Sequence, residues 1–345
     1  MNRLNSILLL IGAMTLLAFA GCTGDQGAQG PAGPAGTATC LQACHTDDYS
    51  MQQYIVDIQN EYASSQHALG TTDVRRSAPC SGCHTTEGYQ YRVANDGDTV
   101  DLDESSHIGC FGCHAPHTNG DFSLRKTGPT DLEAGGTYDR GNSNTCAMCH
   151  QARVPEPALD STDPITSPYW GPHHGPQASV LTGNGAYVFA GVTYSVNHAH
   201  NTGNPDGCVT CHMATPPADG MAGGHSWWMT YVYHGSEELN NNGCVLCHGT
   251  QTDMMALVED SQAAFAADLE TLATGLESLG WLNAAHTQVN PAGVPIDADA
   301  RGAVYNYLLL LDDTTMGVHN PTYARAVLTA TQNYVDGQME ALPLR

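Results

Sequence analysis

Five short segments of this chain repeat the pattern Cys-x-x-Cys-His. The paired cysteines are Cys80 and Cys83, Cys110 and Cys113, Cys146 and Cys149, Cys208 and Cys211, and Cys244 and Cys247. The histidines that follow them are His84, His114, His150, His212 and His248. Two thiols one turn apart can add to the two vinyl groups of one porphyrin, and the histidine then presents a ring nitrogen to the iron. The pattern is that of c-type haem attachment.

Zinc binding and disulfide bonding are the alternatives for these cysteines. Zinc sites pair Cys-x-x-Cys units, but they do not require histidine directly after the second cysteine. Histidine accounts for 17 of 345 residues, so its recurrence at that position in all five segments is not a chance event. Five covalently bound haems are therefore predicted.

A sixth segment, CLQACH, has three residues between its cysteines. It contains Cys40, Cys44 and His45, and we interpret it as a spaced variant of the same motif. Six sites use twelve of the 13 cysteines and leave only Cys22. The sequence thus predicts six molecules of haem c, and a disulfide between Cys40 and Cys44 is the alternative for an exported protein.

The N-terminus has the features of an export signal. Residues 1–21 combine one early positive charge with a short apolar run, which is too short for a membrane span. The run ends in FAGC, which resembles a bacterial lipobox, so Cys22 is expected to be lipidated. Residues 22–39 continue as a collagen-like Gly-x-y tether. We expect a protein anchored by lipid in the periplasm or at the outer membrane and cell surface; cleavage without lipidation is the alternative.

The charge balance limits the partners. Eleven basic and 35 acidic residues give a net charge of −24, which argues against nucleic acid because nucleic-acid binding needs a basic face. An acidic surface suits basic redox partner proteins, which include other cytochromes.

The expected fold is mainly α with extensive loops, and its core is largely haem. Residues 40–250 form the predicted hexahaem body, and residues 251–345 form helices that pack on it. Apolar residues from Val258 to Leu279 recur at helical spacing, and a second helix is expected from about Asp299 to Asp313. A third begins at Asn320, a good N-cap that Pro321 follows.

Eleven histidines remain after the six motif histidines. They are His67, His107, His117, His173, His174, His198, His200, His225, His234, His286 and His319. If every iron has two histidine ligands, six of these eleven are distal ligands. An ordinary lone histidine lies at the surface or in a satisfied core, which leaves that role for the other five.

The C-terminal half resembles pentahaem cytochrome c nitrite reductases and related octahaem cytochromes. The resemblance rests on HAHNTGNPDGCVTCHMA, GGHSWW, GCVLCH and ARGAVYNYLLLLDDTTMGVHNP. It implies a distal ligand for each haem. The implied pairs of distal and motif histidine are His67 with His150, His117 with His45, His174 or His173 with His84, His200 or His198 with His248, His225 with His114, and His319 with His212.

Two departures from that family concern the site of chemistry. The reductases carry lysine where this sequence has His84, and their calcium-binding Glu-Tyr is replaced here by Gln151-Ala152. An electron carrier of anaerobic or extracellular respiration is therefore the leading interpretation. The alternative is a reductase of nitrite, hydroxylamine or a sulfur oxyanion at the His84 haem. Its substrate would contact Arg75, Arg76, His173 and His174. A cytochrome filament is a third, weaker interpretation.

Overall fold

The computed structural model describes residues 49–70, 74–217 and 222–341. The predictions for the signal peptide, Cys22, the tether and the Cys40–Cys44–His45 segment lie outside the described residues. The helices are α3 (Tyr49–Ala63), α4 (Gln66–Leu69), α5 (Ala78–His84), α6 (Thr86–Ala94), α7 (Cys110–Cys113), α8 (Pro116–Asn119), α9 (Asn144–Ala147), α10 (Gln177–Thr182), α11 (Ala199–Thr202), α12 (Cys208–His212), α13 (Val245–His248), α14 (Met254–Ser278), α15 (Ala298–Asp312) and α16 (Pro321–Glu340). Short 3-10 helices are η2 (Gly141–Ser143), η3 (Gly224–Ser226) and η4 (Asn241–Gly243), and the strands are β1 (Thr130–Asp131), β2 (Thr137–Tyr138), β3 (Thr230–Tyr233) and β4 (Ser236–Leu239).

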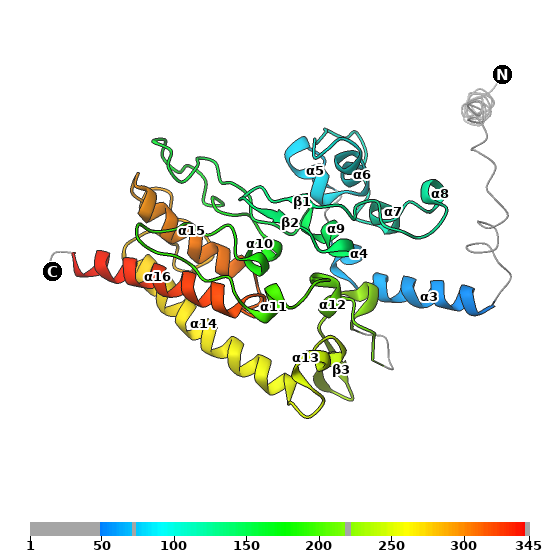
Figure 1. Ribbon diagram of the computed structural model, residues 1–345. Helices are drawn as coiled ribbons and strands as arrows, with labels where there is room; N and C mark the ends of the chain where they lie inside the picture. The colour runs from blue at the N-terminus through cyan, green and yellow to red at the C-terminus, as the bar shows by residue number, and fades with distance from the viewer. Residues whose placement is uncertain (1–48, 71–73, 218–221, 342–345) are drawn as a thin grey trace, which may run out of the picture.

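Helices and long loops dominate the chain, as the sequence predicts. Figure 1 shows the long helices α14, α15 and α16 together in one part of the molecule, while most of the short elements that carry the motifs lie beside them. Two antiparallel pairs, β1–β2 and β3–β4, are the sheets of the described residues. The β3–β4 turn is His234-Gly235, and both residues have positive φ, as a tight hairpin requires. In the described ranges no helix is long and apolar enough to cross a membrane.

Side-chain caps define where the three long helices begin. Asp253 accepts a hydrogen bond from the Ala256 amide, Asp297 accepts one from Ala300, and each thereby satisfies a free donor of the first turn. Asn320 does the same for the Tyr323 amide, with Pro321 in the first turn of α16. The three helices cover the stretches in which the sequence spacing predicts helices.

The largest apolar core lies between α14, α15, α16 and the segment 152–194, which consists of loops and α10. Leu272, Leu309 and Val327 of the long helices are fully buried there, together with Val180 of α10, and Trp170 of the preceding loop is buried beside them. Residues on both sides of the expected boundary at residue 250 thus share one core. Nearer the motifs, the second cluster of buried side chains is small: Leu132, Tyr138, Ala147, Ala178 and Leu181.

Candidate functional site

Each of the five Cys-x-x-Cys-His histidines faces a second histidine from a distant part of the chain. The distances between ring centroids are 6.1 Å for His67–His150, 6.1 Å for His84–His173, 6.2 Å for His114–His225, 6.2 Å for His200–His248 and 6.3 Å for His212–His319. A contact distance that repeats this closely in five unrelated sequence contexts indicates one common cause.

The spacing fits two imidazoles on opposite sides of one iron. A metal–imidazole bond is about 2.0 Å long, and the ring nitrogen lies about 1.1 Å from the ring centre, so two ligands on one axis place their centroids about 6.2 Å apart. Two cysteines beside one member of each pair supply the thioether positions of haem c. The donor set therefore fits this cofactor.

Hydrogen bonds at the opposite ring nitrogen also match metal ligation. The Nδ1 atom lies within hydrogen-bonding distance of an oxygen in five of these rings: His114 with Phe122 O, His150 with Gln177 Oε1, His200 with Val318 O, His212 with Trp227 O and His319 with Asp313 Oδ1. A ring that donates through Nδ1 has Nε2 as its ligand atom, and ligating histidines typically have such a partner.

Burial keeps several of these rings in the neutral form that coordinates iron. Burial and the neighbouring His150 lower the pKa of His67 to about 4. Burial, Arg153 and His174 lower the pKa of His173 to about 4 as well. His319 differs: burial disfavours its charged form, but the Asp313 carboxylate outweighs burial and raises its pKa.

Short helical turns carry the motifs. In α5 the two cysteines are three residues apart, which places both on one face of the turn with His84 at its end. The next helix, α6, crosses so closely that a Cβ at Gly88 would lie 2.2 Å from the Ser81 carbonyl oxygen. From α6 the buried Arg92 donates to Cys83 Sγ and to the Met148 carbonyl, which ties this motif to the next one along the structure.

The partner histidines come from turns and short helices. His67 lies on α4, which Ser65 caps, and His225 lies in η3. His319 precedes α16, and its neighbour Asn320 donates to Leu181 O. His173 has φ of +65° and stands between two glycines in the GPHHGP loop. The left-handed backbone turns this ring toward His84.

The two histidines of the GPHHGP loop differ in position. The sequence left His174 and His173 open as partners of His84, and in the structure the His173 ring faces His84. The His174 side chain is 84% exposed and hydrogen-bonds to Asp312 Oδ1 through Nδ1 at 2.9 Å. The cause is geometric, because consecutive residues point in different directions and the positive φ falls on His173.

The remaining candidate residues lie in different surroundings. His200 pairs with His248, while the His198 ring accepts from the His200 amide. His117 lies beside the Phe111 ring, and its predicted partner His45 lies outside the described residues. Arg76 donates to the Asp103 carbonyl oxygen. Arg75 acts with Arg153 to lower the pKa of His84, although burial of the ring is the larger cause.

Cysteines of neighbouring motifs lie near one another, because each affects the pKa of the other. Cys149 helps to lower the pKa of Cys83, and Cys208 helps to raise the pKa of Cys146. Cys113 lies near Thr145, the residue before Cys146. This proximity links the motifs of His84, His114, His150 and His212 into one continuous group.

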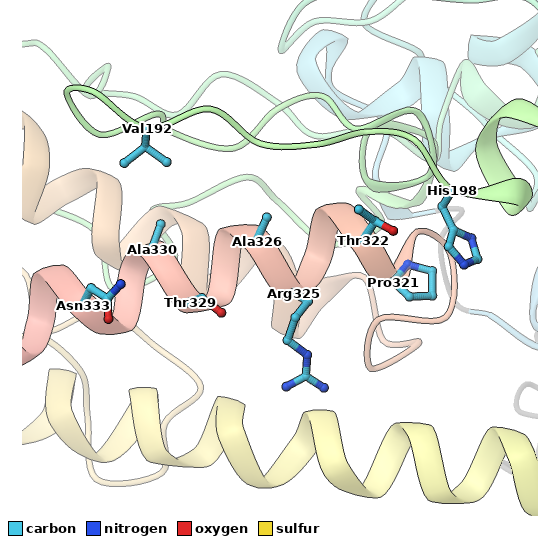
Figure 2. Close-up of a pocket in the computed structure, with 9 residues that line it drawn as sticks. All are labelled: Val192, His198, Pro321, Thr322, Arg325, Ala326, Thr329, Ala330 and Asn333. Carbon is cyan, nitrogen blue, oxygen red and sulfur yellow. The ribbon is translucent and has the colours of Figure 1, made fainter.

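A separate open groove of about 790 Å³ runs along α16, with His198 at one end (Figure 2). Ala326, Ala330 and Val192 line it, and Arg325 extends from α16 toward α14, where it pairs with Asp268. The five histidine pairs lie outside this groove.

Comparison with known proteins gives relatives of one kind. The C-type polyheme cytochrome OmcC of Geobacter sulfurreducens is 22% identical over 361 residues, which cover 81% of this chain and 46% of that protein. The C-type polyheme cytochrome OmcB of the same species is 22% identical over 356 residues, or 80% of this chain and 47% of that protein. The chain is thus similar in sequence to multihaem c-type cytochromes. No protein-family model matches it.

A solved structure shares the fold. The outer cell wall cytochrome OcwA matches with a TM-score of 0.52 and 20% identity, over 81% of this chain and 50% of that one. The chain thus spans about half the length of these relatives. They are named as cytochromes, so the resemblance to nitrite reductases stays a prediction.

Two residues near the pairs were not predicted from the sequence. Asp313 accepts from His319, and Trp227 contacts three of the paired histidines. The position of Trp227 two residues after His225 in GGHSWW was the available signal.

Proposed function

We propose that this protein is an exported multihaem c-type cytochrome that conducts electrons through haems whose irons have two histidine ligands. The five histidine pairs with one common spacing carry the proposal. Haem c, when bound, supplies a one-electron couple between ferric and ferrous iron.

The chain's own residues would do three things. The cysteine pairs would anchor each porphyrin, and the motif histidine and its paired histidine would both bind the iron. An iron held by two histidines would offer no open site to a substrate, which favours an electron carrier. A sixth haem on Cys40, Cys44 and His45, with His117 as its distal ligand, completes the proposed set.

Proximity of neighbouring motifs supports rapid transfer. The proximity of Cys83 to Cys149 and of Cys146 to Cys208 would place the attachment edges of neighbouring haems near one another. Electrons would then move from centre to centre through the covalently joined protein without diffusion of any carrier.

The proposed location follows from the N-terminus. A lipid on Cys22 would hold the protein to a membrane of the periplasm or cell surface, and residues 22–39 would act as its tether. The net charge of −24 favours basic redox partner proteins, other cytochromes among them, through a salt-sensitive contact. Respiration that delivers electrons outward is the proposed physiological setting.

A reductase active at the His84 haem is the second candidate. The observation that favours it is the positive charge of Arg75 and Arg153, which acts on both His84 and His173. Such charge would attract an oxyanion, although haem propionates are an equally suitable partner.

Haem analysis and electron paramagnetic resonance (EPR) of the full-length holoprotein test the proposal. We expect six haems per chain by pyridine haemochrome, all low-spin when oxidised. His173→Ala should convert one haem to high-spin, and His174→Ala should convert none. Fewer than five haems would overturn the proposal, and a high-spin haem that binds nitrite or hydroxylamine in the wild type would favour the reductase.

A further inference from the structure

Trp227 contacts histidines that belong to three different pairs. Its ring lies 4.7 Å from the His67 ring and 5.7 Å from the His225 ring, both edge-on, with interplanar angles of 84° and 64°. Its carbonyl oxygen lies 2.9 Å from Nδ1 of His212. Through these partners one residue touches the ligand sets of His150, His114 and His212.

The local backbone fixes where the indole lies. Trp227 has φ of +57°, a conformation that few non-glycine residues adopt, and it follows the tight turn η3. Glu61 of α3 accepts from the His225 amide at 2.9 Å, and a Cβ at Gly224 would lie 2.3 Å from the same carboxylate. Helix α3 therefore presses this turn into the position that sets the indole between the two histidines.

We propose that Trp227 is a shared positioning residue for histidines of three haem centres: its side chain orients His67 and His225, and its carbonyl oxygen orients His212. Edge-to-face packing resists rotation of the His67 and His225 rings about their iron–nitrogen axes, because rotation would break the contact with the indole. The main-chain carbonyl orients the third ring, His212, independently of the side chain. The inference rests on the proposed function, since it assumes that these histidines bind haem iron.

Ring orientation has a spectroscopic signature that structural damage alone would not produce. The EPR g values of a ferric haem with two histidine ligands depend on the angle between its imidazole planes. That angle is 74° in the His67–His150 pair and 40° in the His114–His225 pair. Loss of the indole should therefore shift the g values of these two haems.

The test compares Trp227→Leu, Trp227→Phe and Trp228→Leu in the full holoprotein. Trp228 is a matched control, because it is the neighbouring tryptophan and its Nε1 donates to the Ser64 carbonyl oxygen. Trp227→Leu should shift two low-spin signals and leave the His212–His319 signal in place, because the carbonyl partner of His212 remains. Trp227→Phe should shift the same two signals less, and Trp228→Leu should shift neither. His67→Ala and His225→Ala assign the signals, since each should turn one haem high-spin.

The outcomes distinguish the positioning role of Trp227 from the proposed electron-transfer function. Unchanged g values in Trp227→Leu, or changes spread over all signals, would overturn the positioning role while the haem count and low-spin state still supported electron transfer. If Trp227→Leu does not accumulate, Trp227→Phe carries the same test, and the absence of any shift there overturns the role. A wild-type protein without low-spin haem would instead refute the proposed function.

Discussion

Replacement of Asp313 tests how the protein sets the potential of one haem. The Asp313 side chain is 2% exposed, and its carboxylate lies 2.7 Å from Nδ1 of His319, which faces His212. A carboxylate that accepts this proton gives the imidazole more negative character, and a more negative ligand stabilises ferric over ferrous iron. Asp313→Asn should therefore raise the reduction potential of this haem.

The size of the shift follows from the contact. Loss of a carboxylate partner behind a metal-bound histidine typically changes metal affinity by about 10- to 100-fold. If that change falls on the ferric form, a factor of ten corresponds to about 59 mV for one electron, so the range is about 60–120 mV. Asparagine keeps an acceptor and loses the charge, which places Asp313→Asn near about 60 mV. Asp313→Ala removes both and should approach about 120 mV.

An EPR-monitored redox titration of the holoprotein measures this potential. Asp312→Asn is the control, because it removes the same charge from the neighbouring position, yet its hydrogen bond goes to the exposed His174. Asp312→Asn should move the potential of the His212–His319 haem much less than Asp313→Asn does. Equal shifts in the two variants, or a downward shift in Asp313→Asn, would refute the hydrogen-bond argument and leave only a general charge effect.

Three further predictions concern other parts of the molecule. The steep interplanar angle of the His84–His173 pair, 82°, predicts an EPR signal with larger g anisotropy than that of His114–His225 at 40°; the reverse order would contradict the ring geometry. Arg301 is buried and donates to the carbonyl oxygens of Ala158, Ser161 and Asp163. In chemical denaturation, Arg301→Met should lower the free energy of unfolding by about 3–5 kcal/mol, whereas Arg325→Met, at an exposed position, should lower it by about 1 kcal/mol or less. Equal losses in the two variants would refute the role of burial. The hydrogen bond to Glu277 raises the pKa of His286, with help from Glu270, so the stability that this contact adds is present below about pH 6.5 and is lost as pH rises through the folded-state pKa. The melting temperature of His286→Gln should therefore lie below that of the wild type at about pH 5.5 and match it at about pH 9. A difference in melting temperature that grows with pH would contradict this prediction.

Local sequence signals predicted the five motif histidines, whereas the family resemblance implied their partner histidines. The motif histidines follow their cysteines directly, and the N-cap signal at Asn320 depends on neighbouring residues only. The choice between His173 and His174 could not be made in this way. Both have the same side chain in one short loop, and the positive φ that orients His173 is set by tertiary packing.

The sequence also could not identify the hydrogen-bond partners of the paired histidine rings. Val318, Phe122 and Trp227 accept through main-chain carbonyls, which every residue type offers, so their side chains give no signal. The sequence did not predict the core that the C-terminal helices share with the segment 152–194, for a related reason. Helical spacing in α14 identifies a buried face, but it does not reveal that this core also includes the segment 152–194, most of which is loop.

The histidine pairs have a consequence for chain topology that is separate from electron transfer. They join residues that stand from 48 positions apart (200 to 248) to 111 positions apart (114 to 225), and several of these spans interleave. An iron held at both ends of such a span closes a loop, as a disulfide does, and a cross-link over about 100 residues removes up to about 4.7 kcal/mol of unfolded-state entropy. Each haem would thus serve as a staple between distant segments. Folding of the chain and attachment of its haems would then be coupled.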